Sequence, residues 1–336
     1  MRPRHCWRRD VDLSSRVREQ LLSFFLDRQD HFVSGEEISD RLQCSRTAIW
    51  KQIEELRKEG YQIEARPKKG YRLLYRPDRV APEEVKLHLS TNRFGQQIRY
   101  RQQVDSTQLL AHEWAREGVE EGALVITEEQ VQGRGRLGRT WVSPPRSGIW
   151  MSLILQPSIP LIQAPQLTLL TSVALTRALR KATDLEIQIK WPNDLLIQGK
   201  KICGILTETR GEQDQVQYVV VGMGINVNVT ESSWPEDVKK TATSLAIEGK
   251  RTYPRAQLIA EILKELEGLY DAYLIHGFDP IRILWEEYAG MLGRQIRTLT
   301  PDGPVEGTAV GLDSSGALLI QRGGQVSPVF SAEIDY

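Results

Sequence analysis

The chain has 336 residues, of which 40% are hydrophobic, and its 44 Lys+Arg balance its 44 Asp+Glu at pH 7. This length and composition suit two or three domains whose cores need neither metals nor disulfides. Three cysteines without C-x-x-C spacing argue against structural zinc and for a reducing compartment, and no apolar run reaches membrane length. We therefore expect a cytoplasmic protein that is neither secreted nor membrane-spanning and that has no metal site of its own.

Charge is distributed unevenly along the chain. Residues 1–79 contain 18 Lys+Arg against 13 Asp+Glu, so this segment carries roughly +5 and the remainder roughly −5. A basic N-terminal segment on an acidic body suggests a nucleic-acid-binding module joined to another activity.

The N-terminal segment has the pattern of a winged helix-turn-helix. Residues 1–12 are expected to form a flexible extension, and the apolar positions of residues 14–26 then follow a helical stripe. A second helix is expected just after Ser34, where capping-box spacing begins, and a third from about Ser45 to Glu59 after a tight turn. Two alternating strands flank a basic tip at residues 66–69, which predicts a hairpin wing.

Helix, short turn and helix, here at about Gly35 to Glu54, form a unit that reads DNA, so we assign residues 1–79 to a DNA-binding domain. The third helix would enter the major groove and the wing would contact phosphates. The candidate DNA contacts are Arg46, Thr47, Trp50, Lys51, Arg66, Lys68 and Lys69. The alternative is a protein-docking module whose basic side chains are merely solvated.

A proline-containing linker leads to a second domain, which we place at residues 80–290. Its first strand, about Ile98 to Val104, ends at Asp105-Ser106-Thr107, where a helical pattern begins. The Ser and Thr are either helix caps or hydrogen-bonding groups for a small ligand, and the sequence leaves both interpretations open.

The stretch Gly133-Arg134-Gly135-Arg136-Leu137-Gly138-Arg139-Thr140-Trp141 alternates glycines with arginines, which is typical of a loop that holds an anion. It contains the letters of a G-x-G-x-x-G motif and nearly those of a Walker A loop. Both motifs require a helix where the glycines end, but Ser143-Pro144-Pro145 cannot start one, and no acidic residue follows about twenty positions later. We reject both motifs and expect a loop between two sheet strands.

A second candidate element is the turn at Lys190-Trp191-Pro192-Asn193-Asp194, which follows an apolar strand. Lys190 leaves this strand beside an indole, so we expect its ammonium group to be partly desolvated. Strands are also expected at residues 201–208 and 218–227, joined as a hairpin. Asn226, beside glycines in the second strand, is either a turn residue or a ligand contact.

The remaining elements close the second domain and predict a third. Helical patterns cover about residues 166–182, 255–275 and 280–289. At residues 291–336 the chain shifts to short strands separated by turns that contain Asp and Gly, which predicts a small β-barrel.

Together these motifs resemble those of the biotin–protein ligases. The resemblance rests on residues 105–107, Gln130, 133–141, 190–194, 204–206 and 224–226. The N-terminal module resembles that of the bifunctional members, which are also biotin operon repressors. The resemblance implies an α+β multidomain fold: an N-terminal winged helix-turn-helix, a central mixed sheet with helices on one side, similar to class II aminoacyl-tRNA synthetases, and a C-terminal SH3-like barrel.

The resemblance also implies a two-step reaction and its partners. Biotin and MgATP would form biotinyl-5′-AMP with release of pyrophosphate, and the adenylate would then acylate a lysine of a biotin carboxyl carrier protein of acetyl-CoA carboxylase or a related biotin-accepting domain. Operator DNA and a ligand-promoted homodimer would be the other partners. Two alternatives are a ligand-sensing transcription factor without catalysis and a ligase whose N-terminal domain no longer binds DNA.

Site residues follow from the same resemblance, with Lys190 and Arg136 as catalytic residues and the glycine loop as a mobile lid. Biotin binding is assigned to Ser106, Thr107, Gln108, Gln130, Gly133, Arg134, Gly135, Arg136, Lys190 and Gly204. ATP binding is assigned to Arg134, Arg136, Arg139, Trp141, Asn193, Asp194 and Asn226. Gln108 stands where the family usually has asparagine, and Leu137 stands where an arginine is common.

Overall fold

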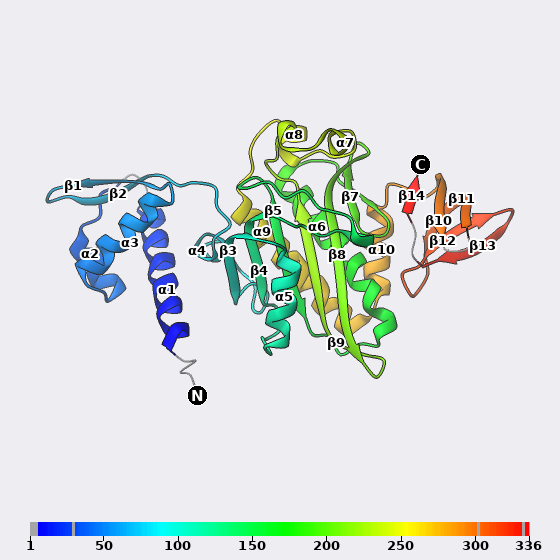
Figure 1. The fold of residues 1–336 in the computed structure, drawn as a ribbon, viewed down its shortest axis with the longest axis horizontal. Coiled ribbons are helices and arrows are strands. Elements are labelled where there is room, and N and C mark those ends of the chain that lie inside the picture. Colours follow the sequence, from blue (N-terminus) through cyan, green and yellow to red (C-terminus); the bar gives the residue numbers. More distant parts are fainter. Residues whose placement is uncertain (1–5, 29–30, 301–302, 331–332, 336) are drawn as a thin grey trace. The chain divides into compact units, whose positions relative to one another are not determined.

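The structure is a computed structural model that describes residues 6–28, 31–300, 303–330 and 333–335. The chain divides into two compact units, residues 1–88 and residues 89–336. Figure 1 shows the helices and strands of both units along the chain.

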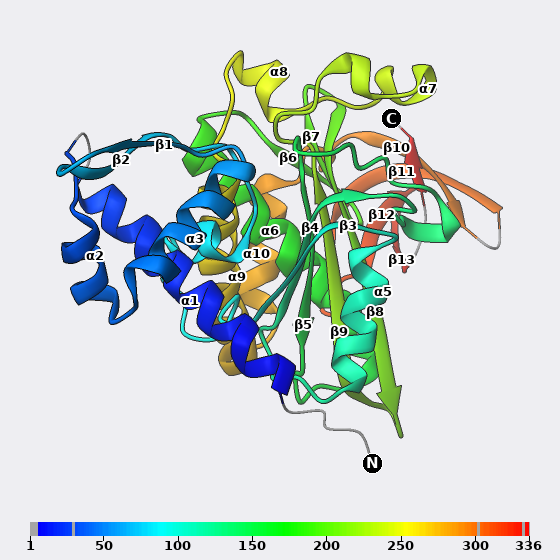
Figure 2. The same ribbon diagram turned by 60° about the vertical axis from the view of Figure 1, so that its left-hand side comes forward.

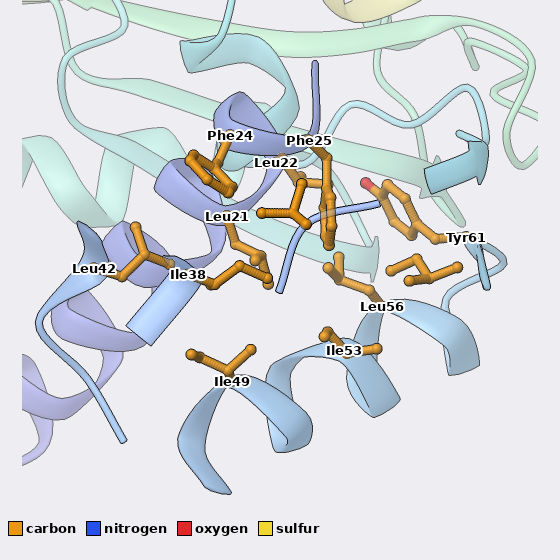
Figure 3. Packing of buried hydrophobic residues seen from close by; sticks show 12 residues of the cluster. Leu21, Leu22, Phe24, Phe25, Ile38, Leu42, Ile49, Ile53, Leu56 and Tyr61 are labelled. Atoms are coloured by element: carbon orange, nitrogen blue, oxygen red, sulfur yellow. The ribbon is translucent and has the colours of Figure 1, made fainter. Parts of the chain in front are cut away.

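The N-terminal unit is a three-helix core with a two-stranded wing. Its first three helices bury leucine, isoleucine and phenylalanine side chains against one another, and Figure 3 shows those of α1 facing Ile49 and Ile53 of α3. The elements are α1 (Cys6–Asp27), α2 (Gly35–Leu42), α3 (Arg46–Lys58), β1 (Gln62–Arg66), β2 (Gly70–Tyr75) and α4 (Pro82–Lys86). The predicted order of helix, turn, helix and hairpin is confirmed.

Local capping fixes the turn between α2 and α3. The Ser34 hydroxyl accepts a hydrogen bond from the Glu37 N–H (3.0 Å), and the Ser45 hydroxyl accepts one from the Ala48 N–H (3.2 Å). Between the helices, Gln43 ends α2 with a left-handed φ of 50°. Serine caps and a left-handed turn residue thus set where the two helices begin and end.

Two boundaries differ from those expected. Helix α1 begins at Cys6, so residues 6–12, expected to be a flexible extension, are helical, and residues 1–5 lie outside the described residues. Helix α4 falls within the residues assigned to the second domain, yet it belongs to the first unit, which extends to His88 rather than to residue 79. The reason is a buried carboxylate: Glu84 accepts hydrogen bonds from the Tyr61 hydroxyl and the Arg76 guanidinium.

The second unit is built on a seven-stranded mixed sheet in the order β3-β4-β5-β9-β8-β7-β6. Strands β3 and β4 are parallel, and the other neighbouring pairs are antiparallel. The strands are β3 (Ile98–Val104), β4 (Leu124–Gln130), β5 (Ile149–Leu155), β6 (Gln188–Lys190), β7 (Asp194–Ile197), β8 (Lys200–Glu212) and β9 (Gln215–Ile225). Strand β5 is buried along its whole length, which explains its continuous apolar sequence.

Helices cover both faces of this sheet rather than one. Helix α5 (Thr107–Arg116) packs Ala111 and Trp114 against side chains of β4, β5 and β9. Figure 2 shows α6 (Ala164–Thr183), α9 (Arg255–His276) and α10 (Asp279–Tyr288) on the opposite face. The expected arrangement with helices on one side was therefore wrong, because α5 carries an apolar face of its own.

The C-terminal strands form a five-stranded antiparallel sheet in the order β13-β12-β11-β10-β14. They are β10 (Gln295–Thr300), β11 (Gly303–Leu312), β12 (Leu318–Arg322), β13 (Gln325–Val329) and β14 (Glu333–Asp335). The predicted change to short strands is confirmed. Within the described parts of the chain, no helix combines the length and hydrophobicity needed to cross a membrane.

Candidate active site

A cavity of about 360 Å³ opens over β5, β8 and β9 of the central sheet. Its wall comes from segments far apart in the chain: the start of α5, the glycine loop, the turn after β6 and the glycines of β8 and β9. The predicted site residues that line it are Ser106, Thr107, Gln108, Gln130, Arg134, Gly135, Arg136, Arg139, Trp141, Lys190, Asn193, Asp194, Gly204 and Asn226. Of the residues assigned to biotin or ATP, Gly133 alone does not line the cavity.

The glycine loop is a short hairpin. The Gly135 N–H donates to the Arg139 carbonyl (2.8 Å), and the Trp141 N–H donates to the Gly133 carbonyl (2.9 Å). A single 3₁₀ turn, η1 (Arg136–Gly138), forms its tip, and the chain then continues to β5 without a helix. The rejection of both phosphate-loop motifs is thus confirmed, because no helix N-terminus faces the cavity from this loop.

Two residues of the hairpin have conformations that its sequence alone did not reveal. Leu137 adopts a left-handed φ of 56° and is 78% exposed, so this side chain points to solvent from a strained backbone position. A Cβ at Gly133 would collide with the Trp141 carbonyl and approach the Gln130 amide within 3.2 Å. Gly133 therefore lies at the base of the hairpin. Close backbone packing, rather than contact with biotin, explains why this position is a glycine.

One end of the cavity is a hydrogen-bonded polar group. The Thr107 N–H and hydroxyl both donate to the Gln130 side-chain carbonyl, at 2.9 and 3.1 Å. The Ser152 hydroxyl lies 2.9 Å from the Thr107 hydroxyl and donates to the Gln108 side-chain carbonyl at 3.0 Å. These side chains orient one another, so this end has a defined pattern of donors and acceptors before any ligand arrives.

The hydrogen bonds of Gln108 explain why a glutamine stands where the family usually has asparagine. Its amide nitrogen donates to the carbonyls of Leu206 (3.2 Å) and Val220 (3.1 Å), and the residue is 3% exposed. The longer side chain thus ties α5 to β8 and β9. A Cβ at Gly222 would come within 2.6 Å of the Gln108 carbonyl oxygen, so a glycine is needed where this amide crosses the sheet.

Ser106 occupies the N-cap position of α5, yet its side chain makes no capping hydrogen bond. The residue is buried in the cavity wall. Helix capping therefore explains where Ser106 lies but gives its hydroxyl no hydrogen bond. This favours the interpretation that the hydroxyl binds a ligand.

The other end of the cavity is an indole on a glycine floor. Gly204 and Gly224 are paired across β8 and β9, and Cβ atoms added there would lie 2.9 and 2.5 Å from the Trp141 ring. The missing side chains leave a flat surface on which Trp141 lies. The Lys201 ammonium lies 5.3 Å from the Trp141 ring centroid and forms an ion pair with Asp194 (2.7 Å).

Apart from the Asp194 oxygen that is paired with Lys201, two buried polar atoms at this end have no hydrogen-bond partner among the described residues. They are the side-chain carbonyl oxygen of Asn226 and the indole nitrogen of Trp141. Asn226 is 2% exposed, and its amide nitrogen donates to the Thr243 carbonyl (3.1 Å), which leaves the oxygen as an acceptor. Buried polar atoms without partners are costly, and a bound ligand would satisfy them.

Lys190 and Arg136 bring positive charge to the cavity wall. Lys190 ends β6, and the Arg136 guanidinium donates to the Asn193 side-chain carbonyl (3.0 Å), which joins the glycine loop to the turn after β6. Asn193 is held in turn by its amide nitrogen on the Ile205 carbonyl (2.9 Å). The two motifs singled out in the sequence are therefore in direct contact.

Sequence comparison gives this site a family. Residues 99–226 match the biotin/lipoate A/B protein ligase family, residues 17–72 an HTH domain, and residues 291–335 the biotin protein ligase C-terminal domain. The chain is 45% identical to the bifunctional ligase/repressor BirA of Bacillus subtilis over 96% of this chain and 99% of the relative. The chain belongs to the biotin protein ligase family.

Two further comparisons agree with this membership. The bifunctional ligase/repressor BirA of Escherichia coli is 30% identical over 90% of this chain and 92% of its own length. The structure of the Aquifex aeolicus biotin protein ligase in complex with biotin and ATP covers 71% of this chain and 98% of that chain, with a TM-score of 0.62 and 30% identity. The expected family and its N-terminal HTH domain are thus confirmed.

In this biotin protein ligase family member, the predicted DNA-contacting side chains lie on the expected elements. Arg46, Thr47, Trp50 and Lys51 are on α3, and the Trp50 indole is 52% exposed beside the buried face of the same helix. Both candidate arginines form ion pairs within the unit: Arg46 pairs with Glu36 (3.0 Å) and Arg66 with Glu64 (2.6 Å). Lys68 and Lys69 lie exposed at the tip of the wing.

Several residues of the cavity wall were missed from sequence. They are Met151, Ser152, Lys201, Met223, Trp234, Val238, Thr241 and Ala242, among others. Ser152 left a signal, because it is a polar residue within the otherwise apolar strand β5. No sequence pattern indicated that Lys201 and Trp234 line the cavity, since a lysine at a strand end and a tryptophan in a loop have many ordinary explanations.

Proposed function

We propose that this chain is an ATP-dependent biotin–protein ligase that forms biotinyl-5′-AMP and transfers biotin to a lysine of a carrier domain. The observation that carries the proposal is one cavity in which an ordered polar group, two cationic side chains and a glycine-floored indole meet. Incubating the chain with labelled biotin and a biotin carboxyl carrier domain tests it. Label should reach the carrier only with ATP, and transfer that does not depend on ATP would contradict the proposal.

The polar end suits the ureido ring of biotin. That ring presents N–H donors and a carbonyl acceptor, and Ser106, Thr107 and Gln130 offer both kinds of partner within one buried wall. Gln108 and Ser152 support this group from behind through their own hydrogen bonds. A fixed set of donors and acceptors rejects ligands that leave one of them unpaired, which gives the site its selectivity.

The indole end suits the adenine ring. Trp141 supplies an aromatic face, and the Asn226 oxygen supplies an acceptor for an exocyclic amine. Guanine carries a carbonyl at the corresponding position, so the same acceptor would discriminate against GTP. Asp194 and Lys201 lie beside the indole, where the ribose and phosphates would follow.

Magnesium would enter with the nucleotide. No cluster of three or more His, Cys, Asp or Glu side chains able to hold a metal occurs among the described residues, which argues against a cage made by the protein alone. Asp194 is a carboxylate in the cavity wall, and Mg²⁺ commonly takes one or two carboxylates together with substrate phosphates and water. The ion would screen the phosphate charges during attack.

Charge repulsion is the main barrier to the first step, because the biotin carboxylate oxygen attacks the α-phosphorus while pyrophosphate leaves. Lys190 and Arg136 place two positive charges in the wall of the cavity. In the second step the amine of the acceptor lysine attacks the acyl carbon, loses a proton, and AMP departs. The glycine hairpin would act as a lid that keeps water from the adenylate.

The acceptor lysine would approach through a second cavity of about 390 Å³. It shares Arg136, Pro192 and Asn193 with the first cavity, and Leu161 and the 73% exposed Phe330 lie on its rim. An aliphatic lysine stem suits such an apolar passage, and the shared wall leads toward the reacting carbonyl. Phe330 follows β13, so the C-terminal sheet, which we propose is SH3-like, would take part in acceptor recognition.

The N-terminal unit would make the protein a biotin-responsive repressor of biotin synthesis genes. Helix α3 and the wing present the expected DNA-contacting residues, and a homodimer would present two such units to a palindromic operator. If the adenylate orders the glycine hairpin and the dimer surface includes it, ligand binding and dimerisation are linked. An operator affinity that does not respond to biotin plus ATP would contradict this part of the proposal.

A further inference from the structure

A fully buried ion pair lies at the base of the glycine loop. Arg255, the first residue of α9, has no exposed surface and donates from its guanidinium to the Glu128 carboxylate at 2.8 Å. The same guanidinium nitrogen donates to the Gly148 carbonyl at 3.0 Å. Arg255 therefore joins two segments that come from more than a hundred residues earlier in the chain.

Both of its partners lie where the pairing between β4 and β5 ends, on either side of the segment that carries the glycine loop. Strands β4 and β5 are paired from Leu124 with Leu153 to Thr127 with Trp150, and the pairing of these strands ends there. Glu128 is the next residue of β4, and Gly148 is the residue before β5. The segment between these two residues carries the glycine hairpin, and it begins and ends where β4 and β5 stop pairing, while β4 itself remains paired with β3 as far as Gln130.

Helix formation does not explain an arginine at this position. The first turn of a helix has a partial positive charge, so a cation there is unfavourable unless an anion compensates for it. A buried guanidinium also loses its hydration, and an apolar pair of similar volume would often be at least as stable. The costs of this arrangement point to a role other than stability of α9.

We propose that Arg255 is a positioning residue that clamps the two ends of the glycine-loop excursion. By fixing Glu128, Arg255 also fixes Gln130, which lies two residues further along β4. The side-chain carbonyl of Gln130 accepts a hydrogen bond from Thr107 at the polar end of the cavity. The clamp thereby sets both the hinge of the hairpin and the orientation of the ligand-binding amide. The inference rests on the proposed role of the hairpin as a lid over the adenylate.

The test uses trypsin, because Arg134, Arg136 and Arg139 make the hairpin a natural cleavage site. A double variant, Glu128→Met/Arg255→Met, removes both charges and leaves no unpaired buried ion, so it should fold, whereas Arg255→Met alone would leave the buried Glu128 carboxylate without its ion-pair partner. Each protein is digested at the same interval below its own melting temperature, and mass spectrometry measures the rate of cleavage after the loop arginines. We expect this rate to be about tenfold higher in the double variant than in the wild-type chain. We also expect the KM for biotin to rise about tenfold, with a smaller change in kcat.

A matched control separates positioning from general destabilisation. Glu267, also buried on α9, accepts hydrogen bonds from the backbone N–H groups of residues 92–94 and not from the glycine-loop excursion. Glu267→Gln should lower the melting temperature while leaving loop cleavage and the biotin KM unchanged. Wild-type loop cleavage in the double variant, or faster cleavage in the control as well, would overturn the clamp.

The wild-type chain shows which proposal has failed. Biotin plus ATP should protect its loop arginines from trypsin if the hairpin closes over the adenylate. Absence of protection in the wild type would reject the lid itself. Protection in the wild type, together with an unchanged double variant, would retain the lid and reject only the role of Arg255.

Discussion

Lys190 supplies positive charge to the active-site cavity from the end of β6. The attack of a carboxylate on a phosphate brings two anions together, so loss of this ammonium group removes stabilisation where negative charge develops. We expect Lys190→Ala to reduce adenylate formation by at least about a hundredfold while the far-UV circular dichroism spectrum stays unchanged. Biotin-dependent pyrophosphate release measures the effect.

Lys200→Ala provides the matched control for this experiment. Lys200 is exposed at the start of β8 and does not line the cavity. Its replacement by alanine removes the same charge as Lys190→Ala but from outside the cavity. It should leave pyrophosphate release near the wild-type rate. A near-normal rate in Lys190→Ala would refute the assigned role.

Arg136 joins the hairpin to the turn after β6 through its hydrogen bond to Asn193. Without that side chain the hairpin loses a direct tie across the cavity, and the adenylate should escape before transfer. We expect Arg136→Gly to biotinylate lysines of unrelated proteins, detected by streptavidin blotting of a protein mixture. Arg146→Gly removes a charge from the same excursion outside the cavity and should keep acceptor selectivity; unchanged selectivity in Arg136→Gly would count against the guard role.

At the scale of elements, the glycine loop and the wing illustrate how short segments acquire their roles. The loop is a hairpin because Gly133 allows close approach of the Trp141 carbonyl and because its tip turns through a left-handed Leu137. The wing is anchored by Glu64, which pairs with both Arg66 and Arg72. Lys68 and Lys69 lie exposed at the tip, next to Arg66, which is exposed but paired with Glu64.

Those wing lysines give a prediction for DNA binding. If Lys68 and Lys69 contact phosphates, the double variant Lys68→Ala/Lys69→Ala should bind more weakly, and the slope of log K against log salt should become less steep by about two. The measurement uses the full chain with biotin and ATP and a duplex selected from a random library. Lys86→Ala, on α4 of the same unit, should leave the slope unchanged, and an unchanged slope in the double variant would exclude phosphate contacts by the wing tip.

At the scale of the whole molecule, Glu267 shows how distant segments hold the second unit together. Burial acts to raise the pKa of Glu267, but backbone hydrogen bonds from Asn92, Phe94 and Arg93, together with the Arg93 charge, outweigh it and lower the pKa. A carboxyl whose pKa is lower in the folded state contributes stability above its ordinary pKa, and this contribution is lost as the pH falls through the folded value.

This linkage predicts a pH-dependent difference in stability. Glu267→Gln should be less stable than the wild type at pH 7, and the difference should shrink as the pH falls below the ordinary glutamate pKa of about 4.5. Urea unfolding of both proteins between pH 3 and pH 7 measures it. A difference that stays constant over this range would show that the carboxylate charge is not what holds residues 92–94.

The sequence by itself determined those features that depend on neighbouring residues. Serine caps and a tight turn set the helix-turn-helix, and the prolines after Trp141 ruled out a phosphate-binding helix. The glycine loop and the Lys190 turn carried enough local chemistry to predict an anion site and, by resemblance, the family. Such features are local because capping, turn formation and helix breaking act within a few residues.

Only the tertiary structure decided which of these residues meet and what holds them. Glu84 assigns α4 to the first unit, α5 covers a second face of the sheet, and Lys201 and Ser152 enter the cavity wall. Arg255 forms an ion pair with Glu128, which is far away in the sequence, and no periodic pattern in either segment predicts this pair. The reason is physical: burial and ion pairing depend on which surfaces the folded chain brings together, and that information is absent from any short stretch of sequence.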